Sequence, residues 1–410
     1  MRDSSSTLAT RILGITVVVT SFGYFIDMFD FFLFNMVRIP SLADLGLKDS
    51  ALTDAGLMIA NWQWAGLLLG AYFSGLVGDK FGRKASLFIS IILYSIGTLS
   101  CGFVHDVPTY ALARFFAGLG LAGELGAGLT LIIEKLAPDR RGFGIMVFIV
   151  MGFIGVLSAS AVVQFLPWRT AYIIGGAAGL MLLFTRVLLM ESGMFEQLRG
   201  LEVPRGGLRL ILRDPLRLKK YLAAIFLMAT SVFIPQILWT LSPELGKDMG
   251  INEPIKVNIV LAVGFSCVIV GDLVAGWLSE RLKSRKKATL VFLIAGMIVF
   301  NKYIIWPVHT LSGFYIENGL LGINFGVWVV GAAWAVEQFG TNIRATVGTT
   351  VPNFARALTI PMNMSYAALK GQGPLIAATV IGVIIFVLAS LGWMCLSETY
   401  GKNLEFSESS

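Results

Sequence analysis

The fold is decided by Gly75-Leu-Val-Gly-Asp79-Lys-Phe-Gly-Arg83-Lys84, a loop with glycines, one acid and a basic pair that lies between two long apolar blocks. A similar loop, Gly276-Trp-Leu-Ser-Glu280-Arg281-Leu-Lys-Ser-Arg285-Lys286, lies between two apolar blocks in the other half of the chain. When one inserted residue is allowed, the glycine, the acid and the basic pair of the two loops coincide. This repeat predicts a chain built from two related halves.

Long apolar blocks continue on both sides of these loops. Hydrophobic residues make up 56% of the 410 residues and charged residues only 14%, below the charged fraction of about 25% in soluble domains. Each block has roughly 18 to 26 residues, enough at about 1.5 Å per residue to cross a hydrocarbon core of about 30 Å. We predict an all-α membrane protein with twelve spans, at residues 12–34, 54–77, 85–104, 108–134, 143–166, 169–190, 219–242, 257–279, 288–308, 312–337, 345–369 and 374–397.

The basic residues indicate how the spans are oriented. Most of the 32 lysines and arginines lie at the two ends of the chain and in the loops after even-numbered spans. Basic loops of this kind are retained on the cytoplasmic side of a membrane. We therefore expect both termini to be cytoplasmic, in a cell inner or plasma membrane. The net charge of +7 then reflects topology, and no nucleic-acid partner is expected.

Other protein classes find little support in the sequence. The first apolar block is too long and too acidic for a cleaved leader, so we expect it to stay in the protein. Cys101, Cys267 and Cys395 lie in or near predicted spans without the spacing of metal ligands. We expect no metal site and no cofactor apart from a proton as coupling ion. No nucleotide loop, zinc spacing, lipase elbow or catalytic histidine cluster is present, so we do not predict an enzyme.

The domain organisation follows from the spans. Residues 191–218 have the acidic, basic, glycine and proline content of a surface linker. This linker divides the chain into a six-helix bundle at 1–190 and another at 219–398, followed by a tail at 399–410. A second repeated signature supports the division: Glu134 is followed by Arg140-Arg141-Gly, and Glu337 by Arg344-Ala-Thr.

These loops resemble the signature of the major facilitator superfamily, and the resemblance covers essentially the whole chain. Arg114-Phe-Phe-Ala-Gly118-Leu-Gly120 and Glu398-Thr-Tyr-Gly401-Lys-Asn-Leu404-Glu405 are similar to sugar-porter-like members. Asp27-Met-Phe-Asp30 and Arg344-Ala-Thr resemble the metabolite and aromatic-acid proton symporters. The resemblance implies the major facilitator fold, with two pseudo-symmetric six-helix halves and spans one, four, seven and ten around a central site, in a monomer embedded in the lipid bilayer.

The repeated loops also suggest a gate. A glycine lets two helices approach closely, an acid accepts hydrogen bonds from a neighbouring helix end, and arginines pair with acids across the loop face. We expect a latch that forms in one carrier state and opens in the other; the alternative is that the basic residues only fix the topology. The candidate gating residues are Gly78, Asp79, Gly82, Arg83, Lys84, Glu134, Arg141, Glu191, Glu280, Arg281, Arg285, Glu337, Arg344 and Glu398.

Charges inside the spans are the candidates for proton coupling. An ionised side chain near the bilayer centre costs at least about 2.5 to 3.5 kcal/mol on insertion scales, so each needs a partner, water or a role. Asp27 and Asp30 share one helical face, and we expect one or both to bind a proton and alternate between pairing with Arg114 and being neutral. The alternative is a permanent structural ion pair. Glu124 either binds a proton or solute or hydrogen-bonds to a neighbouring helix. Asp272 is given no role beyond a helix contact.

Polar and aromatic side chains at similar depths are candidates for solute binding. Arg356 lies near the middle of the eleventh span, where its guanidinium suits a carboxylate of the solute or of Glu124. For the other residues, packing or interfacial anchoring is the alternative. They are Tyr24, Asn35, Gln164, Gln236, Trp239, Glu317, Asn318, Asn324 and Trp334.

Together these features favour a secondary active transporter that takes up a small organic solute with a proton by alternating access. An organic acid or a zwitterion is the favoured substrate. Proton-coupled efflux and facilitated diffusion are alternatives within the same class, although Met151-Gly-Phe-Ile-Gly155 lacks the Gly-Pro pair of drug antiporters. A membrane sensor that binds solute without transporting it is the alternative from another class.

Overall fold

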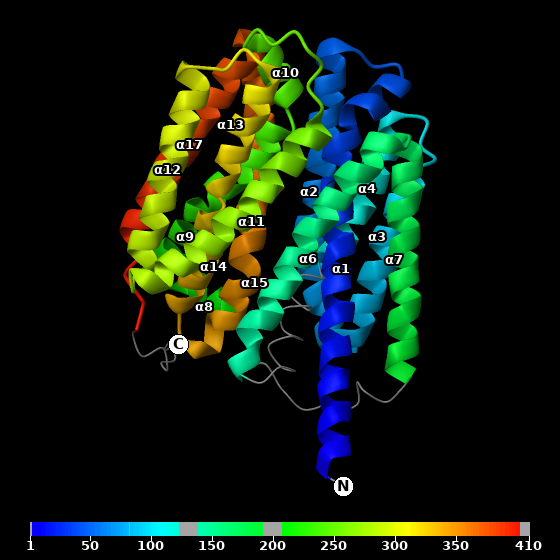
Figure 1. The fold of residues 1–410 in the computed structure, drawn as a ribbon, viewed down its shortest axis with the longest axis vertical. Coiled ribbons are helices and arrows are strands. Elements are labelled where there is room, and N and C mark those ends of the chain that lie inside the picture. Colours follow the sequence, from blue (N-terminus) through cyan, green and yellow to red (C-terminus); the bar gives the residue numbers. More distant parts are fainter. Residues whose placement is uncertain (1, 82, 123–137, 192–206, 402–410) are drawn as a thin grey trace. The chain divides into compact units, whose positions relative to one another are not determined.

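A computed structural model describes the chain except residues 1, 82, 123–137, 192–206 and 402–410 (Figure 1). At 2–16, 74–81, 83–87, 138–143, 145, 185–191, 207–209, 341–342, 345 and 349 only the backbone is described. Within these described parts every regular element is a helix and no strand is present. The predicted all-α class is therefore confirmed.

The chain divides into two compact units, Met1–Gly200 and Leu201–Ser410. The helices of the first unit are α1 (Arg2–Asp44), α2 (Asp49–Phe81), α3 (Arg83–Cys101), α4 (Val107–Leu121), α6 (Pro138–Phe165) and α7 (Trp168–Glu191). Those of the second are α8 (Gly207–Arg213), α9 (Pro215–Phe233), η2 (Ile234–Trp239), α10 (Ser242–Asp248), α11 (Val257–Arg281), α12 (Arg285–Ile305), α13 (Leu311–Ile323), α14 (Gly326–Glu337), α15 (Thr341–Ala357), α16 (Thr359–Leu369), η3 (Lys370–Gln372) and α17 (Pro374–Cys395).

Each predicted span coincides with a helix or with consecutive helices, the fourth as far as the described residues reach. Among the described residues, seven helical stretches are long and apolar enough to cross a membrane. The first span differs from its predicted bounds, because α1 continues to Asp44 instead of ending near residue 34. Asp27 and Asp30 therefore lie near the middle of Val17–Asp44, the part of α1 that is apolar enough to cross a membrane. The predicted linker also contains a short helix, α8.

Close helix contacts shape the first unit. α2 packs on α4, α1 packs on α6, and α3 packs on both α4 and α7. A Cβ atom added at Gly118 would lie 2.1 Å from the carbonyl oxygen of Gln63, and one added at Gly66 would lie 2.1 Å from that of Phe115. Only glycine permits this approach of two backbones. The contact brings Gln63 of α2 beside Arg114 of α4.

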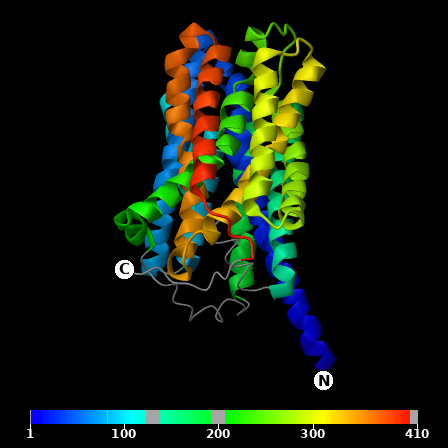
Figure 2. The same cartoon turned by 90° about the vertical axis from the view of Figure 1, so that its left-hand side faces the viewer.

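The helices of the second unit lie lengthwise beside one another as a bundle (Figure 1 and Figure 2). α9 packs on α17, and α11 packs on α13 and α14. Glycines again permit the approach, since a Cβ atom added at Gly322 would lie 2.4 Å from the carbonyl oxygen of Gly264, and one at Gly271 would lie 2.6 Å from that of Ile323.

Three spans of the second unit are interrupted in the described structure, the eleventh of them at Leu358 between α15 and α16. The seventh changes from α9 into η2, a π-helical turn that contains Pro235, whose ring nitrogen carries no hydrogen to donate. The backbone N–H and the Oγ1 hydroxyl of Thr240 both donate to the Pro235 carbonyl oxygen, at 3.1 Å and 2.8 Å. The tenth breaks at Asn324 and Phe325, between α13 and α14. Such interruptions free backbone groups and mark places where a span bends.

Candidate functional site

A fully buried ion pair lies inside the first unit. Arg114 and Asp30 are 0% and 1% exposed, and Nη1 of Arg114 lies 2.9 Å from Oδ1 of Asp30. Nη2 donates to the Asp30 carbonyl oxygen at 3.3 Å, and Nε donates to Oε1 of Gln63 at 3.2 Å. The guanidinium is thus held by one side-chain carboxylate, one amide and one backbone oxygen. The sequence indicated the pairing with Asp30 but not the contact with Gln63.

The second carboxylate oxygen of Asp30 does not share the contact that the first makes with Arg114. Within the described part of the chain, Asp30 Oδ2 is buried and has no hydrogen-bond partner. A buried oxygen with no donor is unfavourable when it carries part of a negative charge and much less so when it carries a proton. One oxygen of Asp30 is therefore firmly held by Arg114, and the other is buried without a donor.

Buried hydroxyl groups lie close to Arg114. The Tyr110 and Tyr172 hydroxyls are 2.7 Å apart, and the Tyr110 hydroxyl donates to Oγ of Ser41 at 3.3 Å. The Arg114 guanidinium carbon lies 5.7 Å from the centre of the Tyr172 ring. Arg114 therefore packs on an aromatic ring as well as pairing with Asp30.

Other predicted residues of the first unit lie as follows. Asp27 is 6% exposed and Asn35 is 7% exposed, so both point into the protein. Tyr24 is buried and stacks on Phe148 with ring centres 4.4 Å apart. Gln164 is exposed near the end of α6. Glu124 lies outside the described residues.

Five buried polar side chains lie on the interrupted spans of the second unit and are here together called the amide cluster: Gln236, Trp239, Asn318, Asn324 and Asn363. Nε2 of Gln236 donates to Oδ1 of Asn363 at 3.1 Å, and Nδ2 of Asn318 donates to the Phe314 carbonyl oxygen at 2.8 Å. In the described residues, Trp239 Nε1 and both amide atoms of Asn324 are buried without hydrogen-bond partners. Trp239 and Asn324 therefore keep buried donors and acceptors that no described protein group satisfies.

Aromatic side chains pack between the interruption of the seventh span and that of the tenth. The Trp239 ring on η2 lies parallel to the ring of Phe325, with an interplanar angle of 11° and centres 6.1 Å apart. A Cβ atom added at Gly264 would lie 2.5 Å from the Trp239 ring. The interruptions of the seventh and tenth spans therefore pack on each other through these rings.

Three predicted residues have partners that the sequence did not indicate. Glu317 is buried and forms an ion pair with Lys302 of α12, so its charge is balanced within its own unit. The Trp334 indole N–H donates to the Ser397 carbonyl oxygen at 2.7 Å, which places Trp334 beside the tail instead of beside Trp239. Arg356 is partly buried, with its guanidinium carbon 5.3 Å from the centre of the Trp328 ring.

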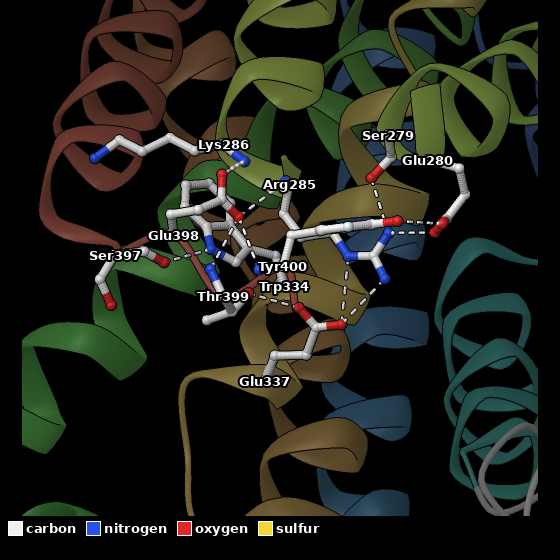
Figure 3. Close-up of polar contacts among 10 residues, drawn as sticks. All are labelled: Ser279, Glu280, Arg285, Lys286, Trp334, Glu337, Ser397, Glu398, Thr399 and Tyr400. Atoms are coloured by element: carbon white, nitrogen blue, oxygen red, sulfur yellow. Dashed lines mark hydrogen bonds and ion pairs between the residues drawn. The ribbon is translucent and has the colours of Figure 1, made fainter. Parts of the chain in front are cut away.

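A second cluster joins the eighth-to-ninth loop to the tail, as Figure 3 shows. We call it the tail latch; its members are Glu280, Ser284, Arg285, Glu337, Glu398 and Tyr400. Arg285 lies between two acids, with Nη1 3.0 Å from Oε1 of Glu280 and Nη2 3.3 Å from Oε1 of Glu337. Tyr400 donates its hydroxyl to Oε2 of Glu280 at 2.8 Å.

Glu398 caps the first turn of α12. Its Oε1 accepts from the Arg285 backbone N–H at 3.0 Å and its Oε2 from the Lys286 N–H at 3.1 Å. Its carboxylate also accepts hydrogen bonds from the Ser284 hydroxyl and from the Tyr400 backbone N–H. A carboxylate at this position satisfies free helical donors and complements the positive end of the helix. Burial raises the pKa of Glu398, but these hydrogen bonds outweigh it and lower the pKa to about 2.

For the remaining gating candidates the structure describes few contacts or only the backbone. Arg344 donates to the Phe339 carbonyl oxygen through Nε at 3.2 Å and Nη2 at 3.0 Å, and Arg281 is exposed at the end of α11. Gly82 and Glu134 lie outside the described residues. Of the following residues the structure describes only the backbone: Gly78, Asp79, Arg83, Lys84, Arg141 and Glu191.

The pKa of Glu398 predicts how pH affects the latch. Because its pKa in the folded protein lies below its ordinary value of about 4.5, ionised Glu398 stabilises the fold above that value, and this contribution is lost as pH falls towards 2. In detergent, Glu398→Gln should lower the thermal unfolding midpoint at pH 5 to 7, and the difference from the parent protein should shrink below about pH 4.5. Glu253→Gln, in an exposed loop, is the matched control. A constant difference at all pH values would contradict the assigned role.

Several contacting residues were not found from the sequence. Lys302 had a usable signal, since it and Glu317 lie at similar depths on the two sides of one short loop. Arg38 is 1% exposed but was overlooked because the first span was predicted to end before it. Gln63 and Tyr400 had no distinguishing signal, because their contacts depend on how α2 meets α4 and how the tail folds back.

The described helices form bundles of apolar spans that carry buried charge pairs. Residues 20–360 match the Major Facilitator Superfamily. The chain belongs to this superfamily and is an integral membrane transporter, not an enzyme, and the predicted fold of twelve spans in two halves is confirmed.

Transporters are found among the similar proteins, which implies a small-molecule substrate. The chain is 26% identical to the niacin transporter of Acinetobacter baylyi, over 88% of this chain and 89% of that protein. It is 26% identical to the sialic acid transporter of Escherichia coli, over 78% of each. A crystal structure of a D-xylose-proton symporter shares the fold, with a TM-score of 0.67, 16% identity and coverage of 96% of this chain and 100% of that one.

Proposed function

We propose that the protein is a secondary active transporter that takes up a small organic acid together with one proton. The observation that carries this proposal is the Asp30–Arg114 pair, in which one carboxylate oxygen is engaged and the other is buried without a hydrogen bond. The two units would alternate access to the solute, and both termini would lie in the cytoplasm.

Charge balance supports an anionic solute. When Asp30 is ionised, its charge cancels that of Arg114. When a proton binds Asp30, the Arg114 guanidinium is left with an uncompensated charge inside the membrane, which is costly. A carboxylate of the solute cancels that charge and accepts the guanidinium hydrogen bonds. One proton and one monoanion therefore enter together without changing the net buried charge, whereas a neutral solute leaves a positive charge behind.

The amide cluster supplies the rest of the recognition. Its amides and the Trp239 ring suit a flat polar molecule with hydrogen-bonding atoms at its edge. Niacin, named for one relative, is a pyridine carboxylic acid, and sialic acid, named for another, also carries a carboxylate. The proposed substrate class is a small carboxylate of this kind, with aromatic monocarboxylates favoured.

The test uses purified protein in liposomes and radiolabelled nicotinate, with nicotinamide as its uncharged counterpart. With an acidic exterior and an alkaline interior, nicotinate should accumulate and nicotinamide should not, and a protonophore should abolish the accumulation. Equal uptake with and without the pH gradient would contradict proton coupling and indicate a facilitator. Nicotinate that raises the unfolding midpoint without crossing the membrane would indicate a sensor.

A further inference from the structure

Asp272 is a carboxylate inside a span that the proposed mechanism does not use. It lies on α11, past the middle of the stretch from Val257 to Arg281 that is apolar enough to cross a membrane. Its side chain is partly buried. In the described part of the chain, Asp272 Oδ1 is fully buried and has no hydrogen-bond partner.

The helices packed against α11 provide no cation for Asp272. Lys302 is paired with Glu317, and Arg285 is paired with Glu280 and Glu337. Among the described residues none forms an ion pair or hydrogen bond with Asp272. The titratable groups of α10, α12, α13 and α14 are Glu244, Lys247, Asp248, Arg285, Lys286, Lys287, Lys302, Tyr303, Tyr315, Glu317 and Glu337, and η2 has none.

The lack of a described partner determines the protonation state of Asp272. An ionised carboxylate inside a span is unfavourable unless a cation, a donor or water compensates its charge. Arg114 provides that compensation for Asp30, whereas no described side chain provides it for Asp272. In the conformation described here, the stable form of Asp272 is therefore the neutral acid.

The position of Asp272 connects this proton to a part of the span that can bend. Its neighbour Gly271 touches the interruption between α13 and α14, since a Cβ atom added at Gly271 would lie 2.6 Å from the Ile323 carbonyl oxygen and 2.9 Å from its Cα. Asn324, the next residue at the interruption, is 2% exposed with both amide atoms lacking hydrogen bonds in the described structure. A bend at this point moves the backbone that Gly271 touches, one residue away from Asp272.

We infer that Asp272 is a second proton-binding site of the transporter, in the C-terminal unit, and that movement at the α13–α14 interruption loads and unloads it. The inference rests on the proposed function and adds a proton that the other unit binds and releases on one side of the membrane. When the interruption opens to water, the O–H bond of the acid breaks and the proton passes to a water molecule. When the interruption closes, the carboxylate takes a proton back from water on the same side, so no other reactant is needed and one proton still crosses the membrane per solute.

The first experiment is infrared spectroscopy of the protein reconstituted in liposomes near neutral pH, without any solute. A neutral carboxylic acid has a C=O stretching band separate from that of a carboxylate. This band should lose a component in Asp272→Asn and shift in Asp272→Glu, which retains an acid. Glu253→Gln, in an exposed loop, should leave the band unchanged.

The outcomes separate this inference from the proposed function. An identical band in the parent protein, Asp272→Asn and Asp272→Glu would overturn the Asp272 assignment whether or not nicotinate is transported. Loss of the component when Na⁺ is added at constant pH would also overturn it, since that result identifies a metal-binding carboxylate. In a second measurement with a pH-sensitive dye inside the liposomes, Asp272→Asn should keep one proton per nicotinate but slow the entry of both, and an unchanged rate would contradict the inference.

Discussion

Asp30→Asn is expected to abolish accumulation of nicotinate by a pH gradient while preserving exchange of nicotinate across the membrane. The substitution keeps the shape of the side chain but removes the acid that binds the proton, so Arg114 stays positive throughout the cycle. For one proton per solute, a difference of about one pH unit, or about 1.4 kcal/mol, supports about tenfold accumulation. The parent protein should approach this value in liposomes, and Asp30→Asn should only equalise the two concentrations.

The control for this experiment lies on the same helix. Asp44 forms an ion pair with Arg169 in which the side chains are 52% and 32% exposed, and exposed pairs contribute little. Asp44→Asn makes the same chemical change as Asp30→Asn and should accumulate nicotinate like the parent protein. If Asp30→Asn still concentrates nicotinate, Asp30 is not a proton carrier and its pairing with Arg114 is structural.

The second large effect is expected at the tail latch. Arg285→Gln removes the contacts to Glu280 and Glu337, leaving two acids without their cation. Each hydrogen bond to a charged group contributes about 1.5 to 3 kcal/mol, which corresponds to a shift of roughly ten- to a hundredfold between two carrier states. If the latch forms in only one state, this shift should slow the initial rate of nicotinate uptake by about tenfold or more.

A neighbouring lysine gives the matched control for the latch. Lys287 lies in the same first turn of α12, and its side chain is exposed. Lys287→Gln removes the same charge without breaking the contacts to Glu280 and Glu337, so its uptake rate should stay close to that of the parent protein. Equal rates for Arg285→Gln and the parent protein, with equal amounts in the membrane, would show that the cluster only fixes the structure.

The architecture could be predicted from the sequence because the lipid bilayer imposes strict rules on the segments that cross it. Spans must be long, apolar and helical, and these rules leave a direct trace in composition. The pairing of Asp30 with Arg114 was accessible for the same reason, since charges inside a membrane need partners. The position of Glu398 was partly accessible, because the tail carries an acid where the repeated loop needs an acceptor.

The rest depends on how side chains meet in three dimensions. Nothing in the sequence distinguishes Gln63 from other glutamines, because its contact with Arg114 follows from the backbone approach at Gly118. Trp334 was expected at the solute site but lies beside the tail, since the direction of one ring on a helix is not set by hydropathy. Asp272 received no role because its lack of partners becomes visible only when all neighbouring helices are placed.

The contact between Glu398 and the start of α12 also has a consequence for biosynthesis. The capping residue follows Arg285 by 113 positions, and at roughly 5 to 20 residues per second a ribosome needs roughly 6 to 23 seconds to cover that distance. During this interval the ninth span enters the membrane with its first amides bonded to water or to Ser284 alone. The start of α12 therefore lacks its contact with Glu398 until the last span has been inserted.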